Sequence, residues 1–298
     1  MHQAGGHTDW NESFYFNVYD REKDVCAFMR IGLKPNRKEK NMFCYLLMPD
    51  GSTIGVKETI PYEGPELIAS GLKYQKIVPE KEWLLEYSGT MRKTVGNIVE
   101  KRKVALSLRF MGVNEVYNYQ QSKVAGGDGF SKIAAAEHME QFGQLKGELI
   151  IDGLKTPISG LGERDHSWGT GDWIAPAVWT WLSCQFSDDL AFNLTKLIVD
   201  QDVVDAGFIY NKGKNEPLVR AEVVTEYAPG GGPSILKTWL TNSKGKVYEV
   251  EGEVIRTAKL PFTSGLERSP PIMFETLAKY RLGDKVGYGV AEYLIRLK

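Results

Sequence analysis

The sequence lacks the features that mark membrane, secreted and disulfide-rich proteins. Only three of its 298 residues are cysteines, and they are widely spaced with no Cys-x-x-Cys pair, which favours free thiols in a reducing compartment. No stretch approaches the roughly 18 uninterrupted apolar residues of a membrane span. The N-terminus has no apolar segment of the kind found in secretory signals. We therefore expect a cytoplasmic protein without a membrane span.

An excess of charge of one sign is also missing. The 37 Lys and Arg residues nearly balance the 38 Asp and Glu residues, and no long basic run occurs. Because a nucleic-acid-binding surface carries a basic footprint, we expect no nucleic-acid partner. The composition, with 42% hydrophobic and 25% charged residues, is typical of a globular chain with a sizeable core.

The signatures of common cofactor and hydrolase families are absent as well. The sequence has no dinucleotide-binding Gly-x-Gly-x-x-Gly, no Walker loop, no His-Glu-x-x-His and no Gly-x-Ser-x-Gly. His138, Glu140, Asp165 and His166 could in principle ligate a metal, but two central histidines without cysteine ligands make a weak zinc site, so we expect no metal. A hydrolase that uses Ser167 ranks low, because Ser167 and His166 would lie on opposite faces of a strand.

The chain does contain period-two alternation along nearly its whole length. Residues 13–19 and 25–33 flank a polar turn and predict a hairpin. About eight such strands lie on each side of the centre, separated by Gly, Pro, Asn and Asp turns, a density typical of barrels and sandwiches. Each half has the size of a small up-and-down barrel that can enclose one ligand. The sequence therefore predicts an all-β fold of two tandem antiparallel barrels.

The least regular part of the sequence precedes the centre. Residues 117–130 are predicted to form a long loop, and residues 131–137 a short helix capped by Ser131. The strand pattern begins afresh after Trp173. We therefore expect an N-terminal barrel over residues 1–173 and a C-terminal barrel over residues 174–298.

The centre of the chain concentrates charged, titratable and aromatic residues. In an extended strand, Arg164, His166 and Trp168 share one face, and Asp165 and Ser167 share the other. Two interpretations remain open: a structural polar network, and an acid–base site in which burial and neighbouring charges shift a pKa toward neutrality. Nearby aromatic residues could wall a cavity at such a site, namely Trp168, Trp173, Trp179, Trp181, Tyr117 and Tyr119.

Two segments resemble the lipocalin-like double-barrel superfamily that includes carotenoid 1,2-hydratase, tocopherol cyclase and AttH-like proteins. They are His138-Met-Glu-Gln-Phe-Gly143 and Gly162-Glu-Arg-Asp-His-Ser-Trp-Gly-Thr-Gly-Asp-Trp173. The resemblance implies two lipocalin-like barrels and a cavity near their junction that accepts apolar, often isoprenoid, molecules. It also implies protonation of a carbon–carbon double bond without an organic cofactor.

The same resemblance suggests roles for individual residues. The His-x-Trp pair implicated in catalysis by carotenoid hydratases matches His166 and Trp168, and an acid beside that histidine matches Asp165. This chain departs from the hydratases at Arg164, where they carry a second histidine. The leading hypothesis is thus a cofactor-independent hydratase or cyclase, of the lyase or isomerase class, that acts on a hydrophobic alkene.

In this hypothesis Asp165 or His166 donates or relays the proton, and Arg164 adjusts the acidity of that group. Glu140 is an alternative acid. The expected substrate-binding residues are Trp168, Trp173, His138, Tyr119, Trp179, Trp181 and Asp172. The alternative is a non-catalytic binding protein for a hydrophobic small molecule, in which the Arg-Asp-His-Ser-Trp-Gly cluster is structural. Both hypotheses name a small hydrophobic molecule as the partner.

Overall fold

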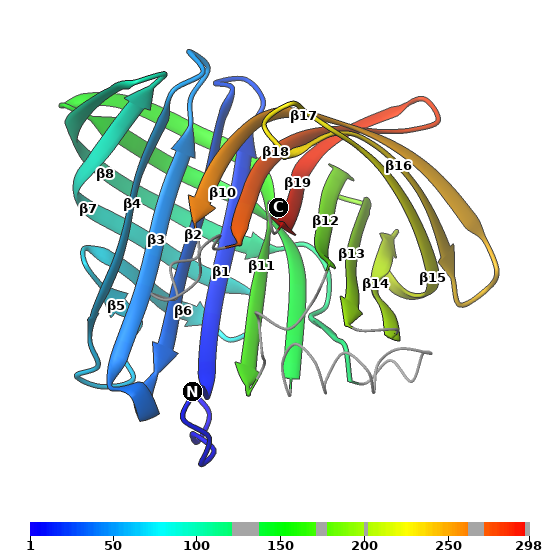
Figure 1. The fold of residues 1–298 in the computed structure, drawn as a ribbon, viewed down its shortest axis with the longest axis horizontal. Coiled ribbons are helices and arrows are strands. Elements are labelled where there is room, and N and C mark those ends of the chain that lie inside the picture. Colours follow the sequence, from blue (N-terminus) through cyan, green and yellow to red (C-terminus); the bar gives the residue numbers. More distant parts are fainter. Residues whose placement is uncertain (121–136, 171–177, 200–201, 262–270, 296–298) are drawn as a thin grey trace. The chain divides into compact units, whose positions relative to one another are not determined.

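A computed structural model describes residues 1–120, 137–170, 178–199, 202–261 and 271–295 (Figure 1). Their regular secondary structure is β-strand apart from one short 3-10 turn, η1 (Pro35–Arg37). No helix among the described residues is long and apolar enough to cross a membrane. The chain divides into two compact units, of which the first comprises Met1–Val116 and Ala136–Gly171, and the second Tyr117–Ala135 and Asp172–Lys298.

Ten antiparallel strands build the first unit. They are β1 (Asn11–Asp20), β2 (Val25–Lys34), β3 (Glu39–Leu47), β4 (Thr53–Pro61), β5 (Ile68–Ala69), β6 (Leu72–Val78), β7 (Glu82–Val95), β8 (Ile98–Gly112), β10 (Glu137–Ile151) and β11 (Leu154–Gly169). Their order is β4-β3-β2-β1-β11-β10-β8-β7-β6-β5, and β4 also pairs with β7. This last pairing links the two arms of the sheet, so that eight of the strands form a ring.

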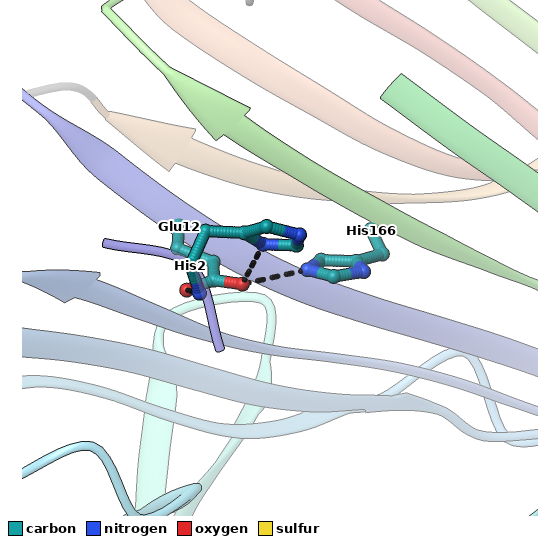
Figure 2. A group of neighbouring side chains, drawn as sticks. All are labelled: His2, Glu12 and His166. Atoms are coloured by element: carbon teal, nitrogen blue, oxygen red, sulfur yellow. Dashed lines mark hydrogen bonds and ion pairs between the residues drawn. The ribbon is translucent and has the colours of Figure 1, made fainter. Parts of the chain in front are cut away.

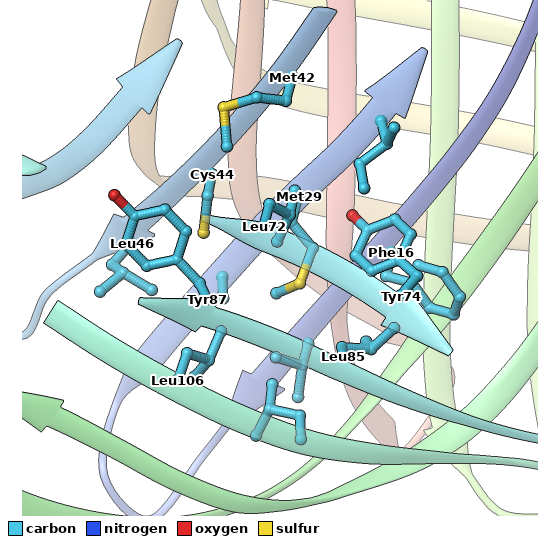
Figure 3. Close-up of a cluster of buried hydrophobic side chains, with 14 of the residues drawn as sticks. Phe16, Met29, Met42, Cys44, Leu46, Leu72, Tyr74, Leu85, Tyr87 and Leu106 are labelled. Atoms are coloured by element: carbon cyan, nitrogen blue, oxygen red, sulfur yellow. The ribbon is translucent and has the colours of Figure 1, made fainter. Parts of the chain in front are cut away.

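Alternate side chains of these strands fill the interior of the ring. Phe14 and Phe16 of β1 pack there with apolar residues from the other strands, including Met29, Cys44 and Leu85. Figure 3 shows a part of this core, with Phe16, Met29 and Cys44 among the labelled side chains. The alternation of apolar residues therefore defines the inner face of β1, as period-two side-chain geometry requires.

The second unit is a closed eight-stranded barrel in the order β12 to β19. Its strands are β12 (Val178–Ser187), β13 (Leu190–Val199), β14 (Asp202–Asn211), β15 (Lys214–Tyr227), β16 (Pro233–Asn242), β17 (Val247–Pro261), β18 (Ile272–Leu282) and β19 (Lys285–Ile295); the unit also includes β9 (Tyr117–Asn118). Leu182, Cys184 and Phe192 belong to its core. The predicted all-β double barrel is confirmed.

Some expectations for the centre of the chain need correction or stay open. Glu137, predicted to end a helix, is the first residue of β10. The rest of that helix and most of the predicted loop, residues 121–130, lie outside the described residues. The proposed boundary between residues 173 and 174 also lies outside them and remains a prediction.

The glycines of β11 let this strand approach β1 closely. A Cβ atom on Gly162 would lie 2.0 Å from the carbonyl oxygen of Asn17, and one on Gly160 would lie 2.3 Å from that of Tyr19. Real Cβ atoms essentially never approach other atoms within 3.0 Å. These two glycines therefore allow the β1–β11 pairing that brings the central motif beside β1.

Candidate functional site

The central motif lies on β11, between β1 and β10 in the sheet of the first unit. Phe14 pairs with His166 and Phe16 with Arg164, so both motif residues share the inner face of the barrel with these core phenylalanines. Asp165 pairs with Tyr15 on one side and with Glu140 on the other. As predicted, the strand directs its residues alternately to two faces, and the two faces carry two separate polar groups.

The inner group consists of His2, Glu12, His166 and Trp168, of which Figure 2 shows the first three. Glu12 is 1% exposed, and its Oε1 lies 2.9 Å from Nε2 of His166 and 2.8 Å from Nδ1 of His2. The backbone N–H of His2 donates to the other carboxylate oxygen at 3.1 Å. Phe14 stacks on the His166 ring at a centroid distance of 4.0 Å. Glu12 is thus a buried carboxylate held by two imidazoles.

Burial and hydrogen bonds set the protonation states of Glu12 and His166. Burial alone would raise the pKa of Glu12, but hydrogen bonds from His166 and His2 outweigh it and lower the pKa to about 2. Burial lowers the pKa of His166 to about 4, although Glu12 opposes this shift. Near neutral pH the carboxylate is therefore ionised and His166 is neutral, with its Nε2–H donated to Glu12.

Arg164 lies deeper in the same barrel. Its Nε donates to Oε1 of Gln141 at 2.8 Å, and its guanidinium lies over the ring of Trp83, 5.7 Å from the centroid. Gln141 in turn donates to the backbone oxygens of Glu80 and Asn114. Burial lowers the pKa of Arg164 to about 10, which keeps the guanidinium charged near neutral pH. Arg164 is part of an ordered interior network.

The outer group consists of His138, Glu140 and Asp165. Nε2 of His138 lies 2.6 Å from Oε1 of Glu140 and 3.3 Å from Oδ2 of Asp165. The side chains are 4%, 0% and 16% exposed, respectively. Burial raises the pKa of Asp165, while the charges of His138 and Arg30 and a hydrogen bond from Ser167 counteract it. The structure thus brings two carboxyl groups together on one histidine.

Three of the predicted binding residues belong to the second unit. The Tyr119 hydroxyl donates to the side-chain oxygen of Asn193, and Nε1 of Trp179 donates to Oε1 of Glu292 at 2.7 Å. Trp181 neighbours Trp179 on the same face of β12, and all three predicted residues are buried. Asp172 and Trp173 lie outside the described residues.

Two members of the inner group were missed by sequence reasoning. Glu12 lies one strand period before Phe14, so the alternation of β1 already placed this carboxylate on the inner face. A buried carboxylate needs a charged or hydrogen-bonding partner. An acid on a predicted inner face therefore indicates that another polar side chain lies beside it. His2 precedes the first strand, and no local pattern predicts its contact with Glu12.

Both groups contain residue types that bind metal ions. In each group, His2–Glu12–His166 and His138–Glu140–Asp165, three ligand-type atoms lie within 4.8 Å of one another. Each group also links its imidazoles to carboxylates by direct contacts. Such imidazole–carboxylate contacts allow a proton to be shared, which is the chemistry that general acids and bases use.

Comparison with solved structures shows that other proteins have the same fold. An AttH-like protein from Nitrosomonas europaea has 13% identity and a TM-score of 0.67, with 98% of this chain and 95% of that chain covered. Kievitone hydratase from Nectria haematococca has 10% identity, a TM-score of 0.63 and coverages of 96% and 88%. CghA has 9% identity, a TM-score of 0.63 and coverages of 98% and 89%.

These proteins share the lipocalin-like double-barrel fold that the central motif predicted. No curated protein matches the chain. The sequence matches one family over residues 1–296. The chain therefore belongs to the family described as "Domain of unknown function (DUF7064)".

Proposed function

We propose that the protein is a cofactor-independent enzyme of the hydratase or cyclase type that protonates an alkene in a hydrophobic, isoprenoid-like substrate. The observation that carries this proposal is the outer group, in which His138 contacts both Glu140 and Asp165 in a buried position. One protein of the same fold is, by its name, a hydratase. Alkene hydration and alkene-initiated cyclisation both need a strong general acid shielded from water.

Asp165 is the proposed proton donor. Burial raises the pKa of this carboxyl group and so favours its protonated form. Its O–H bond breaks as a C–H bond forms at one alkene carbon, which leaves a cation at the other carbon. Water or an internal hydroxyl captures the cation and loses its proton to the Asp165 carboxylate, which restores the acid.

The neighbours of Asp165 have positioning roles in this scheme. His138 fixes the two carboxyl groups relative to each other, and Glu140 is the second acid. His166 lies on the opposite face of β11 and therefore acts only through the strand. Arg164 likewise lies on the inner face, where it stabilises the barrel interior.

The test is turnover of a panel of isoprenoid alkenes in D2O and in H2 18O, followed by mass spectrometry. Alkene protonation places solvent deuterium on carbon in either reaction, whereas 18O enters only a hydration product. D165N should lower the rate by about a hundredfold or more. The matched control is D152N, which changes an exposed carboxyl at the turn between β10 and β11. Unlabelled products, or equal rates for D165N and wild type, would refute the proposal.

A non-catalytic binding protein for a hydrophobic small molecule is the second candidate. It is favoured by the inner face, where Arg164 and His166 both have buried hydrogen-bond partners. If the motif is purely structural, D165N should unfold the protein at a much lower temperature, since breaking a buried charge pair costs about 3–5 kcal/mol. If it is an active site, the D165N variant should lose about a hundredfold or more in rate and retain the wild-type melting temperature.

A further inference from the structure

His2 precedes the first strand and contacts both Trp168 and Glu12 of the inner group. Its ring stacks on Trp168 with a centroid distance of 3.7 Å and an interplanar angle of 7°. Because the ionised Glu12 carboxylate can only accept, Nδ1 of His2 donates to it, and the backbone N–H donates as well. Trp168 thus supplies a flat surface for the ring. Glu12, drawn with His2 in Figure 2, supplies an acceptor at the edge of the His2 ring.

The rest of the N-terminal arm, residues 1–10, is mostly exposed, although Trp10 is buried and Asp9 forms an ion pair with Arg37. The His2 side chain is 40% exposed, whereas Glu12 beneath it is 1% exposed. Residues 5–8 are exposed, and the arm is fixed there by Asn36, whose Nδ2 donates to the carbonyl oxygens of Gly5 and His7. Removing the His2 ring therefore changes no strand, but it uncovers a carboxylate and an indole face.

We propose that the position of the His2 ring, between Trp168 and Glu12, is a binding site for a planar ring that carries a hydrogen-bond donor, such as a phenol. The aromatic face of Trp168 stacks on the ring. The hydroxyl O–H donates a charge-assisted hydrogen bond to the Glu12 carboxylate. His2 is then a built-in competitor, since it satisfies both requirements itself.

The barrel interior behind this position contains two buried polar groups in addition to packed aromatic rings. His166 stacks on Phe14, whose ring lies 5.8 Å from that of Trp83. Nε1 of Trp83 and the hydroxyl of Tyr74 are buried and have no hydrogen-bond partner among the described residues. Buried donors are normally satisfied, so these two groups can donate to acceptor oxygens.

The experiment uses the full chain and two probes, 4-fluorophenol and fluorobenzene, with binding followed by 19F NMR. H2A removes the competitor, and H7A is the matched control because His7 is an exposed histidine of the same arm. H2A should bind 4-fluorophenol about tenfold or more tightly than wild type and H7A do. It should also prefer 4-fluorophenol to fluorobenzene by about tenfold, as expected for a hydrogen bond to a charged acceptor.

A double variant tests the stacking surface. W168L in the H2A background should weaken 4-fluorophenol binding, with the near-UV circular dichroism spectrum as the check on folding. Equal binding by H2A and wild type would overturn the proposal, as would equal binding of the two probes by H2A. The readout is binding rather than turnover, so its outcome is separate from that of the proposed alkene chemistry at Asp165.

Discussion

Replacing His166 with glutamine should make the protein less sensitive to acid. Burial lowers the pKa of His166 from 6.5 to about 4, so the unfolded chain takes up a proton at higher pH than the folded chain does. This group stabilises the fold fully above pH 6.5, and the contribution is lost as the pH falls toward 4. At about 1.4 kcal/mol per pKa unit, the loss amounts to about 3 kcal/mol.

H166Q removes the titration and keeps a donor, because a glutamine amide can donate to Glu12 as Nε2 of His166 does. Urea unfolding measured between about pH 7 and pH 4.5 covers most of the window and stays above the range in which Glu12 is protonated. Across this pH range, the free energy of unfolding of wild type should fall by about 2–3 kcal/mol more than that of H166Q. H7Q, which changes an exposed histidine, should behave as wild type. A loss in H166Q as large as that of wild type would refute this explanation of acid sensitivity.

Other substitutions test the packing around the site. G162A should destabilise the fold by about 3 kcal/mol or more, because its Cβ would lie 2.0 Å from the Asn17 carbonyl oxygen. The control G6A places a Cβ in open space and should leave the melting temperature unchanged. R164M should cost about 1–3 kcal/mol in urea unfolding, because it removes the donor to Gln141 inside the barrel; a neutral result would mean that the network contributes nothing. Cys44 is buried and its thiol pKa is raised to about 12, so it should react with a thiol reagent only after unfolding, and rapid labelling of the native protein would contradict this.

Much of the fold follows from local pattern. The alternation of Phe14, Phe16 and Val18 defines the inner face of β1, and the same period correctly separates Arg164 and His166 from Asp165. Apolar residues at every second position bury one face of a strand, so the pattern and its physical cause lie within a few residues. This is why the strands and their faces can be predicted from the sequence.

The partners across strands could not be predicted in the same way. Glu12 and His166 are 154 residues apart, and only the pairing register of β1 with β11 brings them together. Glu140 and Asp165 were each candidate acids, but their contact through His138 depends on the register of β10 with β11. Register results from the whole set of strand pairings and turns, so one segment does not reveal it.

The geometry of β11 also limits how its adjacent residues can act together. Asp165 and His166 are covalent neighbours, yet their side chains project to opposite faces and meet different partners: His138 and Glu140 for one, Glu12 and Phe14 for the other. A proton cannot pass directly between these two side chains, because the strand backbone separates them. The motif therefore carries two separate polar groups on one strand, a carboxyl pair outside the barrel and an imidazole–carboxylate pair inside it. A substitution at an even-numbered position from 164 to 168 perturbs the inner group first, and one at 165 or 167 perturbs the outer face.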